Sequence, residues 1–312
     1  MLRYLARRIG GGIVVLLGVT LLTFALIFLV PGDPALMLAG PNARPEEVEL
    51  LRRRLGLDQP WWAQYVQFLG RLLQGDLGRS YTGEPVASIL AARLPATLAL
   101  AATGLLSWVV FGIAFGTLVA WRRSRAGNAG LLAFSILGAS VPTFWIGVLF
   151  LWLFGVQLRW FPVGGYGSWR HLVLPTLTLA VSGVATYARL AHAHLEAALQ
   201  QDYLRTARAK GLPERRVMLR HALPNALLPL VTLAGSDLAV LIGGVVFTES
   251  VFNWPGIGRL AVERMSSLDI PVLMGIVLVT ASTVVIVNLV LDLIYPLLDP
   301  RIRGEGERSP PA

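Results

Sequence analysis

The sequence predicts an all-α membrane protein with six transmembrane helices, and three observations carry this prediction. Of the 312 residues, 55% are hydrophobic and only 14% are charged, whereas a soluble domain carries about a quarter charged residues. Mean hydropathy is +0.64. Charged residues gather between long uncharged stretches, most of which reach the roughly 20 apolar residues that a helix needs to cross a bilayer.

The six expected spans are residues Ile9–Val30, Leu94–Trp121, Ala126–Leu158, His171–Ala188, Ala222–Phe247 and Ile270–Leu291. The first apolar run is too long for a signal peptide, and the residues after it, Pro31-Gly32-Asp33-Pro34, do not form a small-residue cleavage site. Prolines within the later spans, at 142, 175 and 229, either kink these helices or serve ordinary packing.

The charge distribution predicts the orientation. Nucleic acid binding is one explanation of the net charge of +9. The basic residues do not form one continuous face, however, and this argues against a nucleic acid partner. A cytoplasmic N-terminus places 16 of the 27 Lys and Arg residues in cytoplasmic segments, in keeping with the excess of basic residues in short cytoplasmic loops. Both termini are therefore expected in the cytoplasm.

Three regions follow from this topology. Residues 1–93 hold the first span and a long extracytoplasmic loop, residues 94–300 hold five spans with a cytoplasmic loop at 195–223, and residues 301–312 form a cytoplasmic tail. Within the long loop, Glu46–Leu57 and Trp61–Leu73 have helical apolar spacing. These two helices either rest on the bilayer surface or receive a partner protein.

The sequence offers no catalytic or metal site. It contains no cysteine, which excludes disulfides, thiolate metal sites and cysteine nucleophiles. His192 and His194 lie two positions apart on a helix and therefore point to different faces. No Gly-x-x-x-x-Gly-Lys-[Ser/Thr] phosphate loop is present, and Gly10-Gly11-Gly12 is better explained by close helix packing.

The most informative cytoplasmic segment is the elbow, residues 201–225. Helix-forming residues run over Asp202–Lys210, and Gly211 suits the left-handed position that ends a helix, with Leu212 supplying the accompanying hydrophobic contact. Pro213 and Glu214 suit the first turn of a second helix. This second helix is expected to reach residues 221–223 before Pro224 breaks it. An amphipathic pair anchored in the headgroup region is the alternative interpretation.

Asp237 is the one acidic residue deep inside an expected span. A charge at membrane depth is costly and usually faces a cavity or a partner. Asp237 is therefore a candidate residue of a transport pathway or of a subunit interface, and capping of an unwound backbone is the alternative.

The spacing within the elbow resembles the cytoplasmic signature of bacterial importer permeases, which is Glu-Ala-Ala, three residues, Gly, nine residues, Ile, one residue, Leu-Pro. Here Arg205-Thr206-Ala207 occupy the triplet, Gly211 follows after three residues, and His221-Ala222-Leu223-Pro224 follow after nine more. The residues at 205, 206 and 221 depart from this signature, and they resemble the variant of it that is typical of the dipeptide/oligopeptide/nickel permeases. Further blocks are similar to that subfamily over nearly the whole chain, among them 55–60, 75–81, 140–145, 249–258 and 295–303.

This resemblance implies the type I ABC importer permease fold and a non-enzymatic role as the permease subunit of an ATP-driven importer in the bacterial inner membrane. It implies partnership with a second homologous permease, two ATP-binding subunits, an extracytoplasmic solute-binding protein and membrane lipid, with ATP and magnesium held by the ATPase. The residues that it implies for ATPase coupling are Asp202, Tyr203, Arg205, Thr206, Ala207, Ala209, Lys210, Gly211, Leu223 and Pro224. The residues expected at an outer gate or docking surface are Phe252, Asn253, Trp254, Pro255 and Gly256, for which an interfacial aromatic turn is the alternative.

Two other classes of function remain open. A self-contained ion-coupled carrier would place ionisable groups at the midplane, and only Asp237 supports it. An intramembrane enzyme would need a convergent cluster of His, Asp or Glu, which the sequence does not suggest. The solute stays undetermined among dipeptides, oligopeptides, glutathione, nickel and oligosaccharides.

Overall fold

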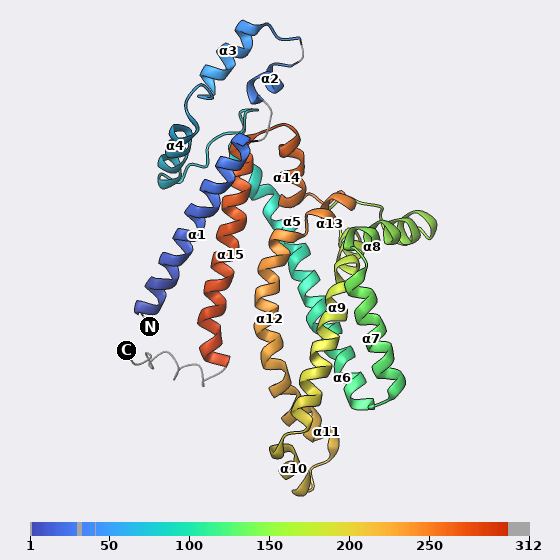
Figure 1. The fold of residues 1–312 in the computed structure, drawn as a ribbon. Helices are drawn as coiled ribbons and strands as arrows, with labels where there is room; N and C mark the ends of the chain where they lie inside the picture. Colours follow the sequence, from blue (N-terminus) through green and yellow to red (C-terminus); the bar gives the residue numbers. More distant parts are fainter. Residues whose placement is uncertain (1, 30–32, 41, 299–312) are drawn as a thin grey trace. The chain divides into compact units, whose positions relative to one another are not determined.

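The computed structural model describes residues 2–29, 33–40 and 42–298, and the secondary structure of these residues is helical, without strands (Figure 1). The expected tail at 301–312 and the residues Pro31 and Gly32 lie outside the described residues. The chain divides into two compact units, Met1–Leu98 with Pro255–Ile286 and Ala99–Trp254 with Val287–Ala312. Each unit is described by itself.

The prediction of six spans is confirmed among the described residues when one bent helix pair counts as a single span. Five single helical stretches are long and apolar enough to cross a membrane, namely Arg7–Leu26, Val86–Arg122, Trp169–Leu199, Glu214–Gly243 and Ile270–Leu291. The sixth is the pair Arg125–Ser140 and Thr143–Gln157, whose halves meet at an angle of 97°.

The first unit contains α1 (Leu2–Leu29), α2 (Pro34–Ala39), α3 (Pro45–Arg54), α4 (Trp61–Leu73), the start of α5 (Val86–Ser107), α14 (Ile257–Ser266) and most of α15 (Ile270–Leu298). One apolar cluster joins α1, α4 and α15 through Phe24, Tyr65, Phe68 and Met274. The Tyr65 hydroxyl also lies 3.1 Å from the Thr20 hydroxyl of α1. This cluster fixes α4, which the apolar spacing predicted, against the first span.

A buried carboxylate holds the loop before α5 to the corner before α15. Asp269 is only 2% exposed, and it accepts hydrogen bonds from the Ser80 hydroxyl at 2.5 Å and from Arg264 at 3.4 Å. The backbone N–H of Tyr81 approaches the second carboxylate oxygen at 3.4 Å. Because a buried carboxylate is costly unless it is hydrogen-bonded, these contacts specify the position of the loop.

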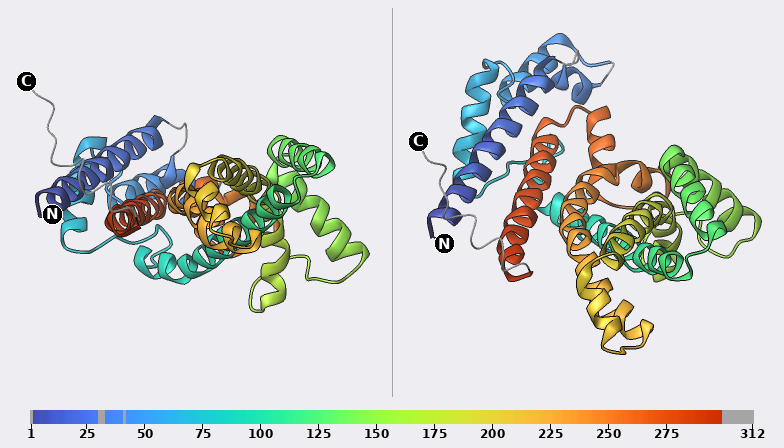
Figure 2. Two further views of the ribbon diagram at one scale, coloured as in Figure 1. Left: turned by 90° about the horizontal axis from the view of Figure 1, so that it is seen from below. Right: turned by 60° about the horizontal axis from the view of Figure 1, so that its bottom comes forward.

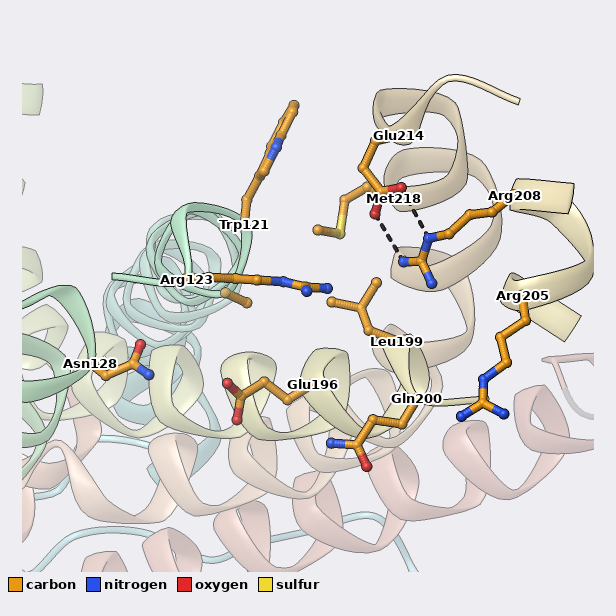
Figure 3. A pocket seen from close by; sticks show the side chains of 11 residues that line it. Trp121, Arg123, Asn128, Glu196, Leu199, Gln200, Arg205, Arg208, Glu214 and Met218 are labelled. Atoms are coloured by element: carbon orange, nitrogen blue, oxygen red, sulfur yellow. Dashed lines mark hydrogen bonds and ion pairs between the residues drawn. The ribbon is translucent and has the colours of Figure 1, made fainter. Parts of the chain in front are cut away.

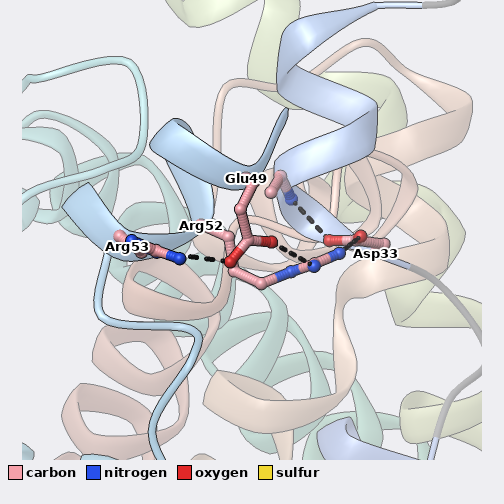
Figure 4. A network of polar contacts seen from close by, with 5 residues as sticks. Asp33, Glu49, Arg52 and Arg53 are labelled. Atoms are coloured by element: carbon pink, nitrogen blue, oxygen red, sulfur yellow. Dashed lines mark hydrogen bonds and ion pairs between the residues drawn. The ribbon is translucent and has the colours of Figure 1, made fainter. Parts of the chain in front are cut away.

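A second polar network joins α2 to α3 in the long loop (Figure 4). Asp33 accepts the N–H of Ala35 at 3.0 Å, which caps the start of α2, and it pairs with Arg52 of α3. Arg52 also donates to Glu49 at 2.9 Å. Burial raises the pKa of the Asp33 carboxyl, but the hydrogen bonds from Arg52 and Ala35 lower it by more, so the pKa lies below its usual value.

The second unit is organised around α9 (Trp169–Leu199), a 31-residue helix. Packed along it are the π-helical segment η1 (Trp108–Gly112), α6 (Ile113–Arg122), α7 (Arg125–Ser140) and α12 (Leu223–Gly244) (Figures 1 and 2). Small residues allow this close approach. A Cβ atom at Gly116 would lie 2.2 Å from the Ala188 carbonyl oxygen, and one at Gly183 would lie 2.0 Å from the Trp108 ring.

The third expected span, Ala126–Leu158, is not one straight helix. Helix α7 ends at Ser140, and α8 (Thr143–Phe150) and the π-helical segment η2 (Leu151–Gln157) continue at 97° to it. Val141 has the extended backbone that a following proline imposes, because Pro142 disfavours helical geometry in the residue before it. An uncharged stretch shows no break in hydropathy, so the sequence predicted a single span.

The expected break at Pro224 is also wrong. Helix α11 (Glu214–Arg216), the π-helical segment η3 (Val217–Ala222) and α12 follow one another without interruption. Pro224 lies in the first turn of α12, where its missing N–H is tolerated, and the π-helical turn before it replaces the usual hydrogen-bond pattern. The second half of the elbow is therefore continuous with the fifth span.

Candidate functional site at the helical elbow

The elbow begins with α10 (Asp202–Ala209), which ends in the left-handed turn that the sequence predicted. Gly211 has φ of +78°, a backbone conformation that favours glycine. Its N–H donates to the Arg208 carbonyl at 2.9 Å, and the N–H of Leu212 approaches the Ala207 carbonyl at 3.4 Å. This pair of bonds is a Schellman motif, which satisfies the free carbonyls at the end of a helix.

An ion pair braces the turn that Gly211 opens. Arg208 donates from Nε to Glu214 Oε2 at 3.0 Å and from Nη2 to Glu214 Oε1 at 2.9 Å. The two side chains come from α10 and α11, so the guanidinium and carboxylate form a fork across the Gly-Leu-Pro turn (Figure 3). Bidentate pairs fix orientation as well as distance.

An apolar cluster packs against the base of the elbow. It joins the end of α9 to α10, η3 and α12, and its buried members are Ala120, Leu195, Leu199, Leu204, Ala207, Val217, Met218, Ala222 and Ala226. Leu212 packs against this cluster, which confirms the hydrophobic contact expected for the residue after Gly211. The elbow is thereby joined to two membrane helices, α9 and α12, through shared side-chain packing.

A second set of polar contacts ties the elbow to α12. The Asn225 side-chain amide donates to the Tyr203 hydroxyl at 3.1 Å and to the His221 carbonyl at 2.9 Å. The Tyr203 hydroxyl in turn lies 3.4 Å from that carbonyl. These bonds connect the first turn of α10 to the start of the fifth span.

The residues expected to contact an ATPase separate into two groups by exposure. Those exposed are Asp202, Tyr203, Arg205, Thr206, Ala209, Lys210, Gly211 and Pro224. Ala207 is buried in the supporting cluster and Leu223 is half-buried, so these two position the elbow rather than present a surface. The elbow as a whole carries six basic and two acidic residues over positions 201–225, which gives it a positive surface.

A cavity of about 1110 Å³ lies beside the elbow within the second unit (Figure 3). Its polar lining includes Arg123 from the end of α6 and Glu196 from α9, besides the Arg208–Glu214 pair. Arg123 has a left-handed backbone, with φ of 48°. The cavity separates the turn between α6 and α7 from the elbow.

Asp237 lies on α12 and pairs within the same chain. The Tyr187 hydroxyl of α9 donates to Asp237 Oδ2 at 2.7 Å, and Tyr187 itself is fully buried. The carboxylate is half-buried and lies 50 residues along the chain from Tyr187, so no local pattern predicts this pair. The contact joins the helix that enters the elbow to the helix that leaves it.

The block around Asn253 is a packed corner. Phe252 and Trp254 are only 1% and 2% exposed, whereas Asn253 is exposed and has a left-handed backbone, with φ of 52°. The Phe252 carbonyl accepts the N–H of Gly165 at 3.0 Å. Trp254 meets the ring of Tyr166 edge-on at 4.9 Å between ring centres. The role of this block as an outer gate or docking surface stays a prediction.

Sequence reasoning missed the side chains that brace the site. The sequence indicates only a helix start at Glu214, and it indicates no role for Asn225 or Tyr187. The signal for the Arg208–Glu214 pair was present, since opposite charges six residues apart flank a predicted tight turn. Tyr187 and Asp237 are 50 residues apart, and no local pattern links them.

Comparison with known proteins identifies two matching family models. Residues 112–304 match the model described as "Binding-protein-dependent transport system inner membrane component", and residues 1–101 match the model of its N-terminal region. Together the matched ranges include the whole elbow and every described span except residues 102–111 of the span Val86–Arg122.

Curated relatives match over nearly the full chain. The glutathione transport system permease protein GsiC of Escherichia coli (strain K12) is 40% identical over 304 residues, which cover 97% of this chain and 99% of the relative. A probable peptide ABC transporter permease, y4tP of Sinorhizobium fredii, is 41% identical over 309 residues, with coverage of 96% and 99%.

Solved structures share the fold at low identity. A chain of the MetNI methionine ABC transporter in an inward-facing conformation superposes with a TM-score of 0.57 at 20% identity, covering 70% of this chain and 99% of that chain. A chain of an amino acid ABC transporter crystallised with histidines gives a TM-score of 0.53 at 15% identity, covering 68% and 94%. At these identities the likeness shows the fold alone.

Proposed function

The chain belongs to the family of binding-protein-dependent transport system inner-membrane components, and on that premise we propose that its elbow is the contact that couples it to a separate ATPase. The family makes this chain a multi-pass inner-membrane permease of an ABC importer, a transport protein rather than an enzyme. Such permeases work with an ATPase and a substrate-binding protein.

The observation that carries the coupling proposal is the joint support of the elbow by α9 and α12. A segment that transmits movement must be stiff and must be fixed to the helices that it moves. The Schellman turn at Gly211 and the Arg208–Glu214 fork make the tip rigid. The shared cluster and the Asn225 contacts fix its base to the spans. A short helix pair of this kind fits a groove on a partner.

Charge indicates the nature of that groove. Lys210 is exposed beside Gly211, Arg205 is exposed on α10, and the elbow carries six basic and two acidic residues. An acidic groove on the ATPase would attract this surface and would suppress docking of the wrong partner. The elbow then lies on the cytoplasmic side, together with both chain termini.

The assembly that we propose contains this chain, a second homologous permease, two ATP-binding subunits and an extracytoplasmic solute-binding protein, without nucleic acid. ATP and magnesium would be held by the ATP-binding subunits. Solute-loaded binding protein and ATP would favour different conformations of the paired permeases, so that the path opens alternately to each side.

For the solute, we propose a peptide or a related small molecule. The names of relatives at about 40% identity, which refer to glutathione and to peptides, support this class. We assign the Asp237–Tyr187 pair to the transport path or to the interface with the second permease. In the block at 252–256, the exposed Asn253 is the residue that a binding protein would contact.

Purification with partners tests the proposal. The tagged chain is expressed with its neighbouring genes, extracted in detergent and captured, and a P-loop ATPase is expected to remain bound. A self-contained ion-coupled carrier makes the opposite prediction. Solute uptake into liposomes that contain this chain alone, driven by an ion gradient, would therefore refute the coupling proposal.

A further inference from the structure

A feature without a role in coupling is the arm formed by α8 and η2, residues 143–157. The arm leaves α7 at 97° and contains no charged residue. Trp145 and Trp152 lie on it, each 52% exposed.

The exposed residues of the arm form one stripe. They recur in pairs at intervals of four residues: Phe144 and Trp145, Val148 and Leu149, Trp152 and Leu153, and Val156 and Gln157. The second half of the arm is π-helical, and a π-helical turn holds more residues than an α-helical one. Residues four positions apart therefore stay on one face along the whole arm. All but the last of these residues are apolar.

The opposite face of the arm is packed against the second unit. Ile146 and Gly147 are buried, and a Cβ atom at Gly147 would lie 3.3 Å from both Phe252 and Thr178 side chains. This contact holds the inner face against α9 and the Asn253 corner. The exposed stripe lies on the other side of the arm, and at its start the ring of Phe144 lies beside that of Phe247, with 6.4 Å between ring centres.

The path of the chain places the arm at one membrane boundary. The turn that begins α7 lies beside the elbow, since Arg123 and Arg208 line the same cavity. Helix α7 has 16 residues, which span about 24 Å of a hydrocarbon core of about 30 Å. The arm therefore starts near the boundary opposite the elbow, and α9 returns from that boundary to the elbow (Figure 1).

We propose that the arm lies in the plane of the membrane, at the headgroup boundary opposite the elbow, with its tryptophan-bearing stripe in contact with lipid. Its stripe continues the exposed apolar face of α7, where Leu132, Ile136 and Leu137 are 57%, 56% and 63% exposed. Trp is enriched at membrane boundaries because its ring is apolar and its N–H is polar. A charged protein partner finds no complementary group on this uncharged face.

Immersion depth tests this assignment, and the absence of cysteine makes each introduced one unique. Single variants Phe144→Cys, Val148→Cys, Trp152→Cys and Val156→Cys are spin-labelled in the full chain, reconstituted in vesicles of phosphatidylethanolamine and phosphatidylglycerol. Accessibility to oxygen against a nickel chelate gives the depth of each label. An arm in the plane gives four similar depths, each within about 5–10 Å of the headgroup boundary.

Controls on α7 calibrate the measurement. Labels at Leu132→Cys and Ile136→Cys, four residues apart on a spanning helix, should differ in depth by about 6 Å. If the arm crosses the membrane, its four labels will instead progress by about 18 Å from first to last. Labels that neither reagent reaches would show that protein covers the stripe, and this result overturns the proposal as well. The depths do not depend on the ATPase, so failure of the coupling proposal leaves this test intact.

Discussion

The guanidinium of Arg208 meets the carboxylate of Glu214 through two hydrogen bonds, of 3.0 Å and 2.9 Å, that bridge the Gly-Leu-Pro turn of the elbow. The two side chains are 34% and 50% exposed, so water screens the pair and its contribution to stability is small. Its value lies in geometry, because a two-point contact prevents α10 and α11 from rotating against each other.

Removing this fork should impair coupling more than folding. Glu214→Gln is expected to lower the unfolding free energy by less than about 1 kcal/mol, while solute transported per ATP hydrolysed falls. The exchanged pair Arg208→Glu with Glu214→Arg should recover part of the loss, because the attraction is restored. Thermal unfolding and reconstituted transport measure the two effects. Equal losses in the single and exchanged variants would show that the contact is not used.

Gly211 should tolerate asparagine and reject proline. Its φ of +78° is accessible to Asn, whereas Pro is fixed near −65° and lacks the N–H that donates to Arg208. No neighbour lies within 4 Å of a Cβ atom at this position, so backbone geometry alone decides the outcome. Gly211→Pro is expected to insert normally but to separate ATP hydrolysis from transport, with Gly211→Asn as the matched control. Solute-stimulated ATP turnover at the parental level in the proline variant would contradict the proposal that the elbow transmits movement.

Close packing of Trp108 on Gly183 should make that glycine irreplaceable. The Trp108 indole N–H donates to the Leu179 carbonyl at 2.8 Å, and a Cβ atom at 183 would lie 2.0 Å from its ring. Gly183→Ala should destabilise the folded chain by about 1–3 kcal/mol through overpacking. Gly130→Ala on α7 is the control, because nothing lies within 4 Å of its Cβ position. Similar thermal midpoints for the two variants would contradict the packing account.

The Tyr187–Asp237 hydrogen bond should show coupling in a double-mutant cycle. Tyr187→Phe keeps the buried ring but leaves Asp237 Oδ2 without its donor, at an expected cost of about 1–3 kcal/mol. Asp237→Ala with Tyr187→Phe should cost less than the sum of the single changes. Additive losses in detergent unfolding would mean that the two groups do not interact in the folded protein.

The α2–α3 network should weaken in acid. The folded-state pKa of Asp33 is lowered, so its stabilising effect is fully present above the usual pKa of about 4 and is lost as the pH falls through the folded value. Hydrogen exchange of residues 35–39 should therefore be unchanged between pH 7 and 5, after correction for intrinsic rates, and should accelerate below about 4. Asp33→Asn should remove this pH step, and a step that persists in the variant would assign it to another group.

The sequence predicted those features that local patterns determine. Hydropathy located the six apolar stretches, and the glycine and proline spacing located the turn at Gly211. Helical apolar spacing located α4 from Trp61 to Leu73. Each of these depends on residues within a few turns of one another, so no knowledge of the tertiary structure was needed.

Features that depend on tertiary contacts or on backbone detail could not be predicted in the same way. The bend at Pro142 lies within an uncharged stretch, where hydropathy does not show a change in the direction of the helix axis. Pro224 was expected to end a helix, but the π-helical segment before it allows the helix to continue. At Asp237 the charge was visible and its partner was not, because Tyr187 comes from another helix.

Site-specific crosslinking of the elbow tests the central claim most directly. The chain has no cysteine, so Lys210→Cys places a single thiol on the exposed tip, and Ala39→Cys on α2 serves as a control in the outer loop. With a short bifunctional reagent, the account predicts that the tip variant links to the ATP-binding subunit in the intact complex and that the control does not. An intact complex in which Lys210→Cys gives no link to that subunit, or in which Ala39→Cys links as readily, would contradict the account.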